Sequence, residues 1–144
     1  MFLGAYEHTL DEKGRLTLPA RFRESFQDGL VVTHGLDGCL AVYPAAHWRV
    51  LVDSQLAVLN PLSRDDRMIQ RHFSTRAAES VPDRQGRIGI PAALASGVGL
   101  EREVMVLGVF DHLEIWDRAR WLAESDGAEG RVADAAERLA AKRD

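Results

Sequence analysis

The chain has 144 residues, the usual size of one domain, and can bury a hydrophobic core without a metal or a disulfide. Its net charge of −4 counts against a uniformly basic protein that coats nucleic acid non-specifically. The single cysteine excludes an intrachain disulfide framework, and no apolar run approaches the roughly 18 residues of a membrane helix. The N-terminal residues also lack the basic and long apolar segments of a signal peptide.

A ten-residue segment occurs twice in the chain. Residues 11–20 read DEKGRLTLPA and residues 83–92 read DRQGRIGIPA, so the offset is 72, with Asp, Gly, Arg, Pro and Ala at the same places. Two later segments recur at an offset of 73: residues 31–35 with 104–108, and residues 40–43 with 113–116. The repetition predicts two homologous halves.

Each half shows the same order of predicted elements. Apolar alternation on either side of an Asp-to-Gly turn predicts a hairpin, which is followed by a proline at the first position of a short helix and by two more strands. In the first half these are strands 6–10 and 15–18, helix 20–26, and strands 30–33 and 39–43. In the second half the two later strands are 104–107 and 113–116.

Helices are expected after each half. Apolar residues at helical spacing follow Pro44 as far as Leu59, and Asn60-Pro61 then breaks the chain. Ser63 resembles an N-cap, so residues 63–73 are expected to form a linking helix. A last helix is expected from about Asp117, and residues 125–144 are polar enough to predict a frayed helix or a mobile tail without a site.

Three segments carry a resemblance to a known family: MFLGAYEHTLDEKGRLTLPARFR, GLDGCLAVYP and DRQGRIGIP. They resemble the MraZ family of bacterial transcriptional regulators, which is built from two AbrB-like half-motifs, and the likeness covers nearly all of residues 1–121. The resemblance implies an α+β, mainly β fold: a pseudo-two-fold, swapped-hairpin AbrB-like β-barrel made of two tandem half-repeats with flanking helices. The expected segments are a first repeat at 5–47, linking helices at 48–75, a second repeat at 76–119, and a C-terminal helix and tail at 120–144.

The same resemblance implies a function. It implies a sequence-specific DNA-binding regulator that acts as a ring-shaped homo-oligomer in the cytoplasm, associated with the nucleoid. The expected partner is double-stranded promoter DNA with short direct repeats, upstream of the division and cell wall operon that includes the protein's own gene. Neither a membrane nor a small-molecule substrate is expected as a partner.

The two Asp-x-x-x-Arg motifs, Asp11 to Arg15 and Asp83 to Arg87, are the candidate functional residues. They can be interpreted as turn chemistry, with Asp opening the turn, Gly ending it, and Arg paired to Asp at the surface. Both motifs, however, keep the arginine while the residues between change, and a turn alone does not require arginine. The segment from Asp11 to Arg23 also has a local charge of +2, from four basic and two acidic residues.

The DNA-binding interpretation gives each motif residue a role. Arg15 and Arg87 would reach phosphate oxygens or guanine O6 and N7, while Asp11 and Asp83 would hold their direction. The remaining loop residues are Lys13 and Arg84, expected to contact phosphates, and Gly14 and Gly86, expected in the turns. Whether both halves face DNA is left open by the sequence.

Other chemistry finds little support in the sequence. The five histidines have no paired metal-ligand spacing and one cysteine cannot build a zinc site, so no metal, cofactor or catalytic residue is predicted and the protein is not expected to be an enzyme. A hydrolase using Asp11 or Asp83 would lack an identifiable base or nucleophile. The tryptophans Trp48, Trp116 and Trp121 are expected in the core or at a subunit interface. An alternative function remains: a structural or protein-interaction ring that regulates a partner protein without binding DNA.

Overall fold

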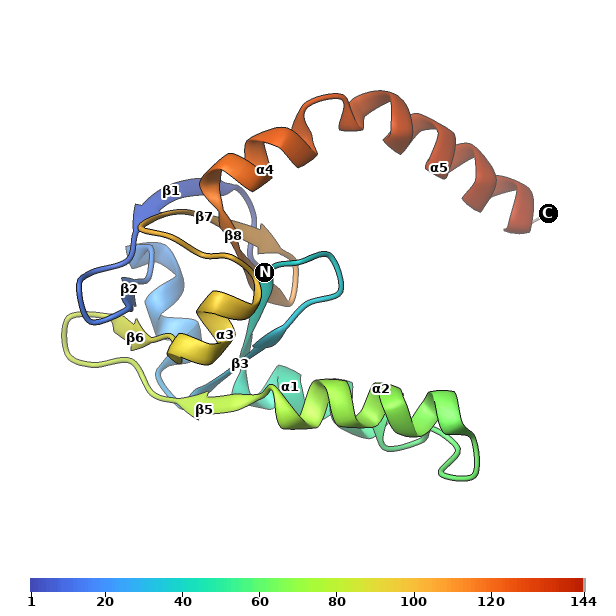
Figure 1. The fold of residues 1–144 in the computed structure, drawn as a ribbon, viewed down its shortest axis with the longest axis horizontal. Coiled ribbons are helices and arrows are strands. Elements are labelled where there is room, and N and C mark those ends of the chain that lie inside the picture. Colours follow the sequence, from blue (N-terminus) through green and yellow to red (C-terminus); the bar gives the residue numbers. More distant parts are fainter. Residues whose placement is uncertain (144) are drawn as a thin grey trace.

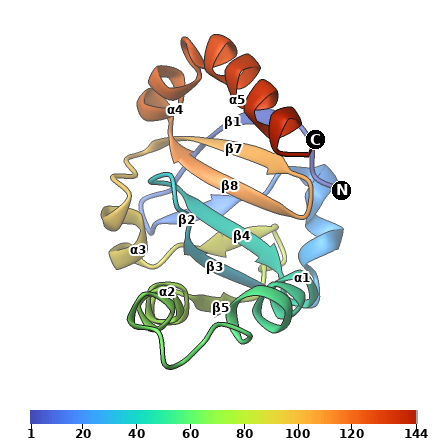
Figure 2. The ribbon, with the colours of Figure 1, turned by 90° about the vertical axis from the view of Figure 1, so that its right-hand side faces the viewer.

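The computed structural model describes residues 1–143, and most of its strands belong to one antiparallel sheet (Figures 1 and 2). Within those residues the sheet has six strands in the order β1-β7-β8-β4-β3-β5. They are β1 (Ala5–Thr9), β3 (Leu30–His34), β4 (Leu40–Pro44), β5 (Ala78–Ser80), β7 (Glu103–Val109) and β8 (His112–Asp117). Two short strands, β2 (Arg15–Thr17) and β6 (Arg87–Gly89), pair with each other in a separate ribbon.

Helices connect and flank these strands. A 3₁₀ helix, η1, takes the place of the first predicted helix, and a π-helical segment, η2, continues α1. The helical elements are η1 (Ala20–Phe26), α1 (Ala45–Leu51), η2 (Val52–Leu56), α2 (Arg64–Thr75), α3 (Ala92–Gly97), α4 (Arg118–Ser125) and α5 (Ala128–Arg143). The molecule is therefore α+β with a mostly antiparallel sheet, as expected.

The two halves exchange strands. Strand β1 of the first half pairs with β7 of the second, β5 of the second half pairs with β3 of the first, and β2 pairs with β6. The expected hairpin between 6–10 and 15–18 is therefore wrong beyond its turn, where an isolated bridge joins Leu10 to Leu16. The physical reason is burial: pairing with β6 places Leu16 opposite Ile88, and both side chains are fully buried there.

Strand pairing also fixes how the halves correspond. Leu16 lies opposite Ile88 and Ala41 lies opposite Glu114, so residues related by the offsets of 72 and 73 face each other across a pseudo-two-fold axis. In β7, however, Val104 takes the place of Leu30, an offset of 74 rather than the predicted 73, since Leu30 pairs with Pro44 and Val104 with Asp117. A slip of one residue would turn a strand's apolar side chains away from the core.

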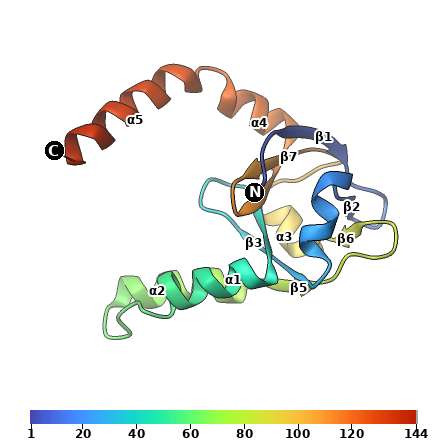
Figure 3. The same cartoon turned by 180° about the vertical axis from the view of Figure 1, so that it is seen from behind.

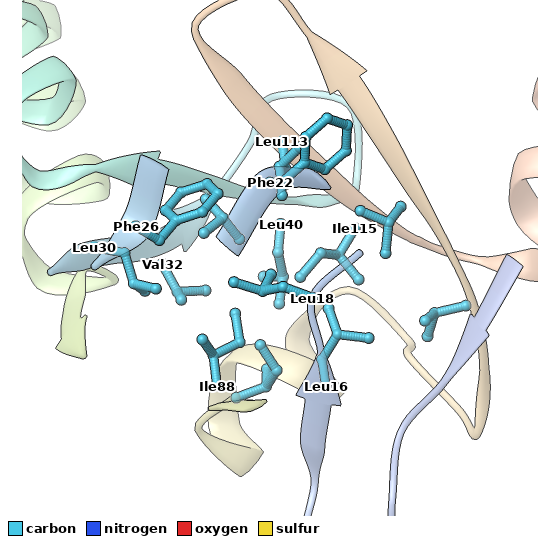
Figure 4. Packing of buried hydrophobic residues seen from close by; sticks show 14 of the residues in the cluster. Leu16, Leu18, Phe22, Phe26, Leu30, Val32, Leu40, Ile88, Leu113 and Ile115 are labelled. Atoms are coloured by element: carbon cyan, nitrogen blue, oxygen red, sulfur yellow. The ribbon is translucent and has the colours of Figure 1, made fainter. Parts of the chain in front are cut away.

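The core lies between one face of the six-stranded sheet and a cover made by the β2–β6 ribbon, η1 and α3 (Figure 4). It is entirely apolar, and each fully buried aliphatic or aromatic side chain contributes about 1.5–3 kcal/mol. Its most buried side chains include Leu16, Leu18, Phe26, Leu30, Val32, Leu40, Ile88, Leu113 and Ile115. Both halves supply it, so neither half contains a complete core of its own.

A smaller cluster covers the opposite face of the sheet. Cys39, the residue before β4, packs with Met105, Leu107 and Trp116, and Trp121 of α4 lies against them. Trp116 is thus a core residue, as expected, and Cys39 packs next to the start of a strand. Burial raises the pKa of the Cys39 thiol to about 12, with Glu114 acting in the same direction, so the thiol stays protonated and unreactive at neutral pH.

Two helical arms project from the same side of the molecule, away from the β2–β6 ribbon (Figures 1 and 3). One arm is α1, η2 and α2; its α2 begins at Ser63, whose Oγ accepts a hydrogen bond from the Asp66 amide at 3.3 Å, as predicted for an N-cap. The other arm is α4 and α5, so residues 128–143 form a helix where a frayed helix or mobile tail was expected. No helix in the described part of the chain is long and apolar enough to cross a membrane.

Candidate nucleic-acid interface

The loop from Asp11 to Arg15 is organised around one carboxylate. Asp11 Oδ1 accepts hydrogen bonds from the Lys13 and Arg15 amides at 2.9 and 2.8 Å, and Asp11 Oδ2 accepts one from Arg15 Nε at 2.7 Å. The Asp11 amide donates to the Arg15 carbonyl, and the Gly14 amide donates to the Asp11 carbonyl. A single aspartate thus shapes the turn and also holds the arginine side chain.

The second loop repeats this geometry. Asp83 Oδ1 accepts from the Gln85 and Arg87 amides, both at 2.9 Å, and Asp83 Oδ2 accepts from Arg87 Nε at 2.7 Å. Gly86 donates to the Asp83 carbonyl just as Gly14 does to Asp11. Identical bonds in two loops of different intervening sequence show that the Asp, Gly and Arg positions form one structural unit.

Glycine is required at the same place in both turns. Gly14 has φ +72° and Gly86 has φ +75°, a left-handed conformation that residues with a Cβ rarely adopt. Gly86 also lies directly beneath the side chain of Arg23, whose Nε donates to the Leu18 carbonyl at 3.0 Å. The two turns therefore share one backbone conformation, and glycine is the residue that adopts it without strain.

The β2–β6 ribbon brings the two arginines onto one exposed face. Arg15 lies opposite Gly89 and Thr17 lies opposite Arg87, while Leu16 and Ile88 point into the core between them. Arg15 and Arg87 are therefore diagonal neighbours on the outer face, and such positions lie about 7–8 Å apart in an antiparallel pair. Both loops project at the end of the molecule away from the helical arms (Figures 1 and 3).

The charge state of this face follows from its hydrogen bonds. The backbone amide of Arg15, more than any other group, lowers the pKa of Asp11, and the Arg87 amide does the same for Asp83. Both carboxylates are therefore ionised at neutral pH and contact the Nε side of their arginine. No hydrogen bond within residues 1–143 engages the terminal amino groups of Arg15 or Arg87, whose side chains are 32% and 29% exposed.

The two predicted phosphate contacts are exposed but are not equivalent. Lys13 is the third residue of its loop, whereas Arg84 is the second residue of the other loop. Thr17 and Gly89 are also exposed beside the arginines, although the two Asp-x-x-x-Arg motifs do not include them. Period-two alternation along 15–18 and 87–90 would have placed them on the same face. Arg102, which the sequence analysis also left out, lies beside the first loop, where its carbonyl accepts a hydrogen bond from the Leu10 amide at 2.8 Å.

Other titratable side chains cluster around His112. Among residues 1–143, no group of three or more His, Cys, Asp or Glu side chains is placed to hold a metal ion. His112 instead lies between Asp111, 2.7 Å from its Nδ1, and Glu114, 3.8 Å from its Nε2, and stacks on Tyr43. These side chains come from β4, β8 and the turn before β8, and none of them belongs to the β2–β6 ribbon.

The duplicated turn unit agrees with what comparison with known families shows. A family model described as "MraZ protein, putative antitoxin-like" matches residues 1–72 and matches again at residues 73–143. The chain belongs to the MraZ family. The double match, one copy for each half, confirms the internal repeat of an MraZ chain.

Curated relatives support the same assignment over most of the chain. A protein of Limosilactobacillus fermentum is 44% identical over 128 residues, 89% of each chain. A protein of Heliobacterium modesticaldum is 44% identical over 140 residues, 96% of each chain, and one of Ligilactobacillus salivarius is 43% identical over 139 residues, also 96% of each. All three are named "Transcriptional regulator MraZ". The MraZ family is thus one of transcriptional regulators and not of enzymes.

Proposed function

We propose that this chain is a sequence-specific DNA-binding transcriptional regulator and that the outer face of the β2–β6 ribbon is its DNA-reading surface. One observation carries the proposal: Arg15 and Arg87 lie on the same exposed face of a two-stranded antiparallel ribbon, each held by an aspartate through Nε. The major groove of B-DNA admits a two-stranded ribbon, and arginine is the side chain that most often reads guanine there.

The roles of the loop residues follow from their bonds. Fixing Nε leaves the two terminal amino groups of each guanidinium for guanine O6 and N7 or for a phosphate. Asp11 and Asp83 position the arginines without touching DNA. Lys13 and Arg84, at the exposed loop tips, would neutralise phosphates and make binding depend on salt. Gly14 and Gly86 would permit the turns that bring these groups to the surface.

The module that carries this surface is proposed to be a swapped-hairpin, AbrB-like barrel formed by the repeats at 5–47 and 76–119, joined by the helices of 48–75. Its support is the exchange of strands between the halves, in which β1, β2 and their counterparts β5 and β6 all pair across the repeat boundary. By strand pairing alone the six-stranded sheet is open in residues 1–143, with β1 and β5 at its edges.

We further propose that several copies assemble into a ring that engages short direct repeats upstream of the division and cell wall operon, including the protein's own gene. Linking several modules can raise apparent affinity by factors of about 10²–10⁴ without new contacts. The support lies in the two helical arms, residues 45–75 and 118–143, which leave large apolar side chains exposed. These are Val50, Val58, Leu62, Met68, Ile69, Leu122, Val132 and Leu139. Such a regulator would act in the cytoplasm at the nucleoid.

The test is a binding titration on the promoter fragment upstream of the protein's own gene, measured by fluorescence anisotropy at several salt concentrations. Arg15→Ala and Arg87→Ala are expected to weaken binding to this fragment more than binding to a random duplex. Arg64→Ala is the matched control, since it removes the same charge at the far end of α2, away from the ribbon (Figure 1). Equal affinity of all three variants and the parent protein would refute the assigned surface.

The exposed apolar arms also favour a second candidate, a protein-interaction ring that regulates a partner without DNA. Native mass spectrometry would then show an assembly that persists, while no duplex shifts in a binding assay at low salt. A salt-dependent preference for the promoter fragment would exclude this candidate.

A further inference from the structure

Thr17 and Gly89 break the symmetry of the arginine face. They are equivalent positions of the two halves, 72 residues apart, and each lies directly opposite an arginine of the other strand. The face therefore presents the same arginine twice, once beside a threonine and once beside a residue without a side chain. The other equivalent positions of the three-residue ribbon differ little in size, since Arg15 corresponds to Arg87 and the buried Leu16 corresponds to the buried Ile88.

The hydrogen-bond pattern of the β2–β6 ribbon places Arg15 and Gly89, and likewise Thr17 and Arg87, in the closer of the two kinds of antiparallel pair. The Leu18 amide donates to the Gly86 carbonyl at 2.9 Å, and the Ile90 amide donates to the Gly14 carbonyl at 3.1 Å. Such bonds flank pairs that do not hydrogen-bond to each other, in which opposing Cα atoms approach to about 4.5 Å. Thr17 is thus the direct cross-strand neighbour of Arg87, whereas the cross-strand neighbour of Arg15 has no side chain.

The glycine at position 89 is not needed by the fold. Its φ lies outside the left-handed region, and a Cβ built there would meet no atom within 4 Å. Glycine also weakens a strand, because it has no side chain to pack and loses more conformational freedom on folding. A strand glycine that serves neither a turn nor tight packing within the chain is typical of a place where a ligand approaches the backbone closely.

We propose that the β2–β6 ribbon reads DNA asymmetrically, with Gly89 admitting a base pair against Arg15 and Thr17 keeping the duplex farther from Arg87. This inference rests on the proposed DNA-binding function. The Arg15–Gly89 end can reach the bidentate contact to guanine O6 and N7, which requires the base edge to come within hydrogen-bond distance of both terminal amino groups. The Arg87–Thr17 end has an exposed threonine, whose methyl group suits contact with a thymine methyl beside a phosphate contact.

The experiment exchanges the two residues. The parent protein, Gly89→Thr, Thr17→Gly and the double exchange are each used to select duplexes from a randomised pool, and affinities for the parent's preferred duplex are measured by competition. Gly89→Thr is expected to lower that affinity about tenfold and to relax the choice of base at the position that Arg15→Ala also relaxes. Its salt dependence is expected to stay the same, because no charge changes. The double exchange is expected to swap the base preferences of the Arg15 end and the Arg87 end along the selected duplex.

Stability separates this effect from misfolding. Threonine favours an exposed strand, so Gly89→Thr is expected to melt at the same temperature as the parent protein or higher while binding DNA more weakly. Gly89→Ala, which adds one methyl group, is expected to shift affinity in the same direction by a smaller factor. If instead Gly89→Thr selects the parent's sequence with the parent's affinity, while Arg15→Ala loses it, the asymmetry is overturned and DNA binding stands. If the parent protein itself prefers no duplex, the proposed sequence-specific DNA binding is refuted, and the asymmetric reading that rests on it is refuted with it.

Discussion

Leu16 and Ile88 lie directly opposite each other at the centre of the β2–β6 ribbon, and neither side chain is accessible to solvent. They are the same position of two homologous halves, so the pseudo-two-fold axis passes between them. The pair ties the outer arginine face to the core beneath it, because the residues before and after each of them point to the surface. A change in this pair is therefore expected to act on stability and on the presentation of both arginines.

Leu16→Ala should destabilise the whole molecule by about 2–5 kcal/mol, the usual cost of removing a fully buried leucine side chain and leaving a cavity. Urea unfolding followed by circular dichroism would measure it. Since the core is shared, both halves should unfold in one transition. Leu36→Ala is the control, because Leu36 is 80% exposed and its removal should change the free energy of unfolding by less than about 0.5 kcal/mol. Separate transitions for the two halves would contradict a shared core.

Gly14→Ala and Gly89→Ala should change stability in opposite directions, although both add one methyl group to the same ribbon region. Gly14 has φ +72°, which costs a residue with a Cβ about 1–2 kcal/mol. Gly89 has open space and no left-handed backbone, so alanine there should stabilise the strand by about 0.5–1 kcal/mol. Thermal melting of the two variants side by side tests this. Destabilisation by both would show that Gly89 has a structural role.

Arg15→Lys should separate charge from geometry at the reading surface. Lysine keeps the positive charge, so the salt dependence of DNA binding should be retained. It cannot donate sideways to Asp11 Oδ2 while presenting a planar pair of donors, so discrimination between the preferred duplex and a random one should fall by about 1–3 kcal/mol. Competition binding measures this difference. Undiminished discrimination would mean that Arg15 acts as a simple charge.

Asp11→Asn tests the positioning role from the other side. The asparagine oxygen can still accept the Lys13 and Arg15 amides, so the turn should persist, but the amide nitrogen cannot accept the Arg15 Nε hydrogen bond. DNA discrimination should therefore fall while the melting temperature changes little. Asp83→Asn, in the equivalent loop, shows whether the Arg87 end depends on its aspartate to the same degree.

The pH dependence of stability should carry a contribution from His112. Burial disfavours its charged form, but the carboxylates of Glu114 and Asp111 outweigh burial and raise the pKa of His112 above 6.5. Because the folded-state pKa is raised, its stabilising contribution is complete below about pH 6.5 and is lost as the pH rises through the folded-state value.

This contribution can be isolated with His112→Gln, by urea unfolding between pH 5.5 and 9 in steps of about half a pH unit. His8 and His72, whose pKa values are lowered mainly by burial, act in the opposite sense, so the informative quantity is the difference between the parent and the variant. That difference should shrink as the pH rises. A difference independent of pH would show that the His112 cluster contributes by packing on Tyr43 and not by charge.

The local features of this protein are predictable from its sequence alone. The Asp-to-Gly turns, the Ser63 cap and the alternation along 15–18 depend on neighbours within a few residues, so local sequence patterns predict them. The repeat at offset 72 is visible when the sequence is compared with itself. The family resemblance followed from three sequence segments, and the candidate arginines followed from the two Asp-x-x-x-Arg motifs. Alternation of apolar and polar residues, however, predicts only that a strand has a buried face. Nothing in residues 6–18 predicts which strand will pair with it.

The pairing of the strands, in contrast, depends on contacts between distant parts of the chain. Strand β1 pairs with β7 and β2 with β6 in place of a local hairpin, because pairing across the halves buries Leu16 against Ile88. The folded structure also sets the offset between β3 and β7 at 74, since only that register keeps Leu30 and Val104 on the core face. The same pairing put Arg15 and Arg87 on one face and set Thr17 and Gly89 beside them. Burial between distant segments therefore determines which residues share a surface, and a local sequence pattern does not predict it.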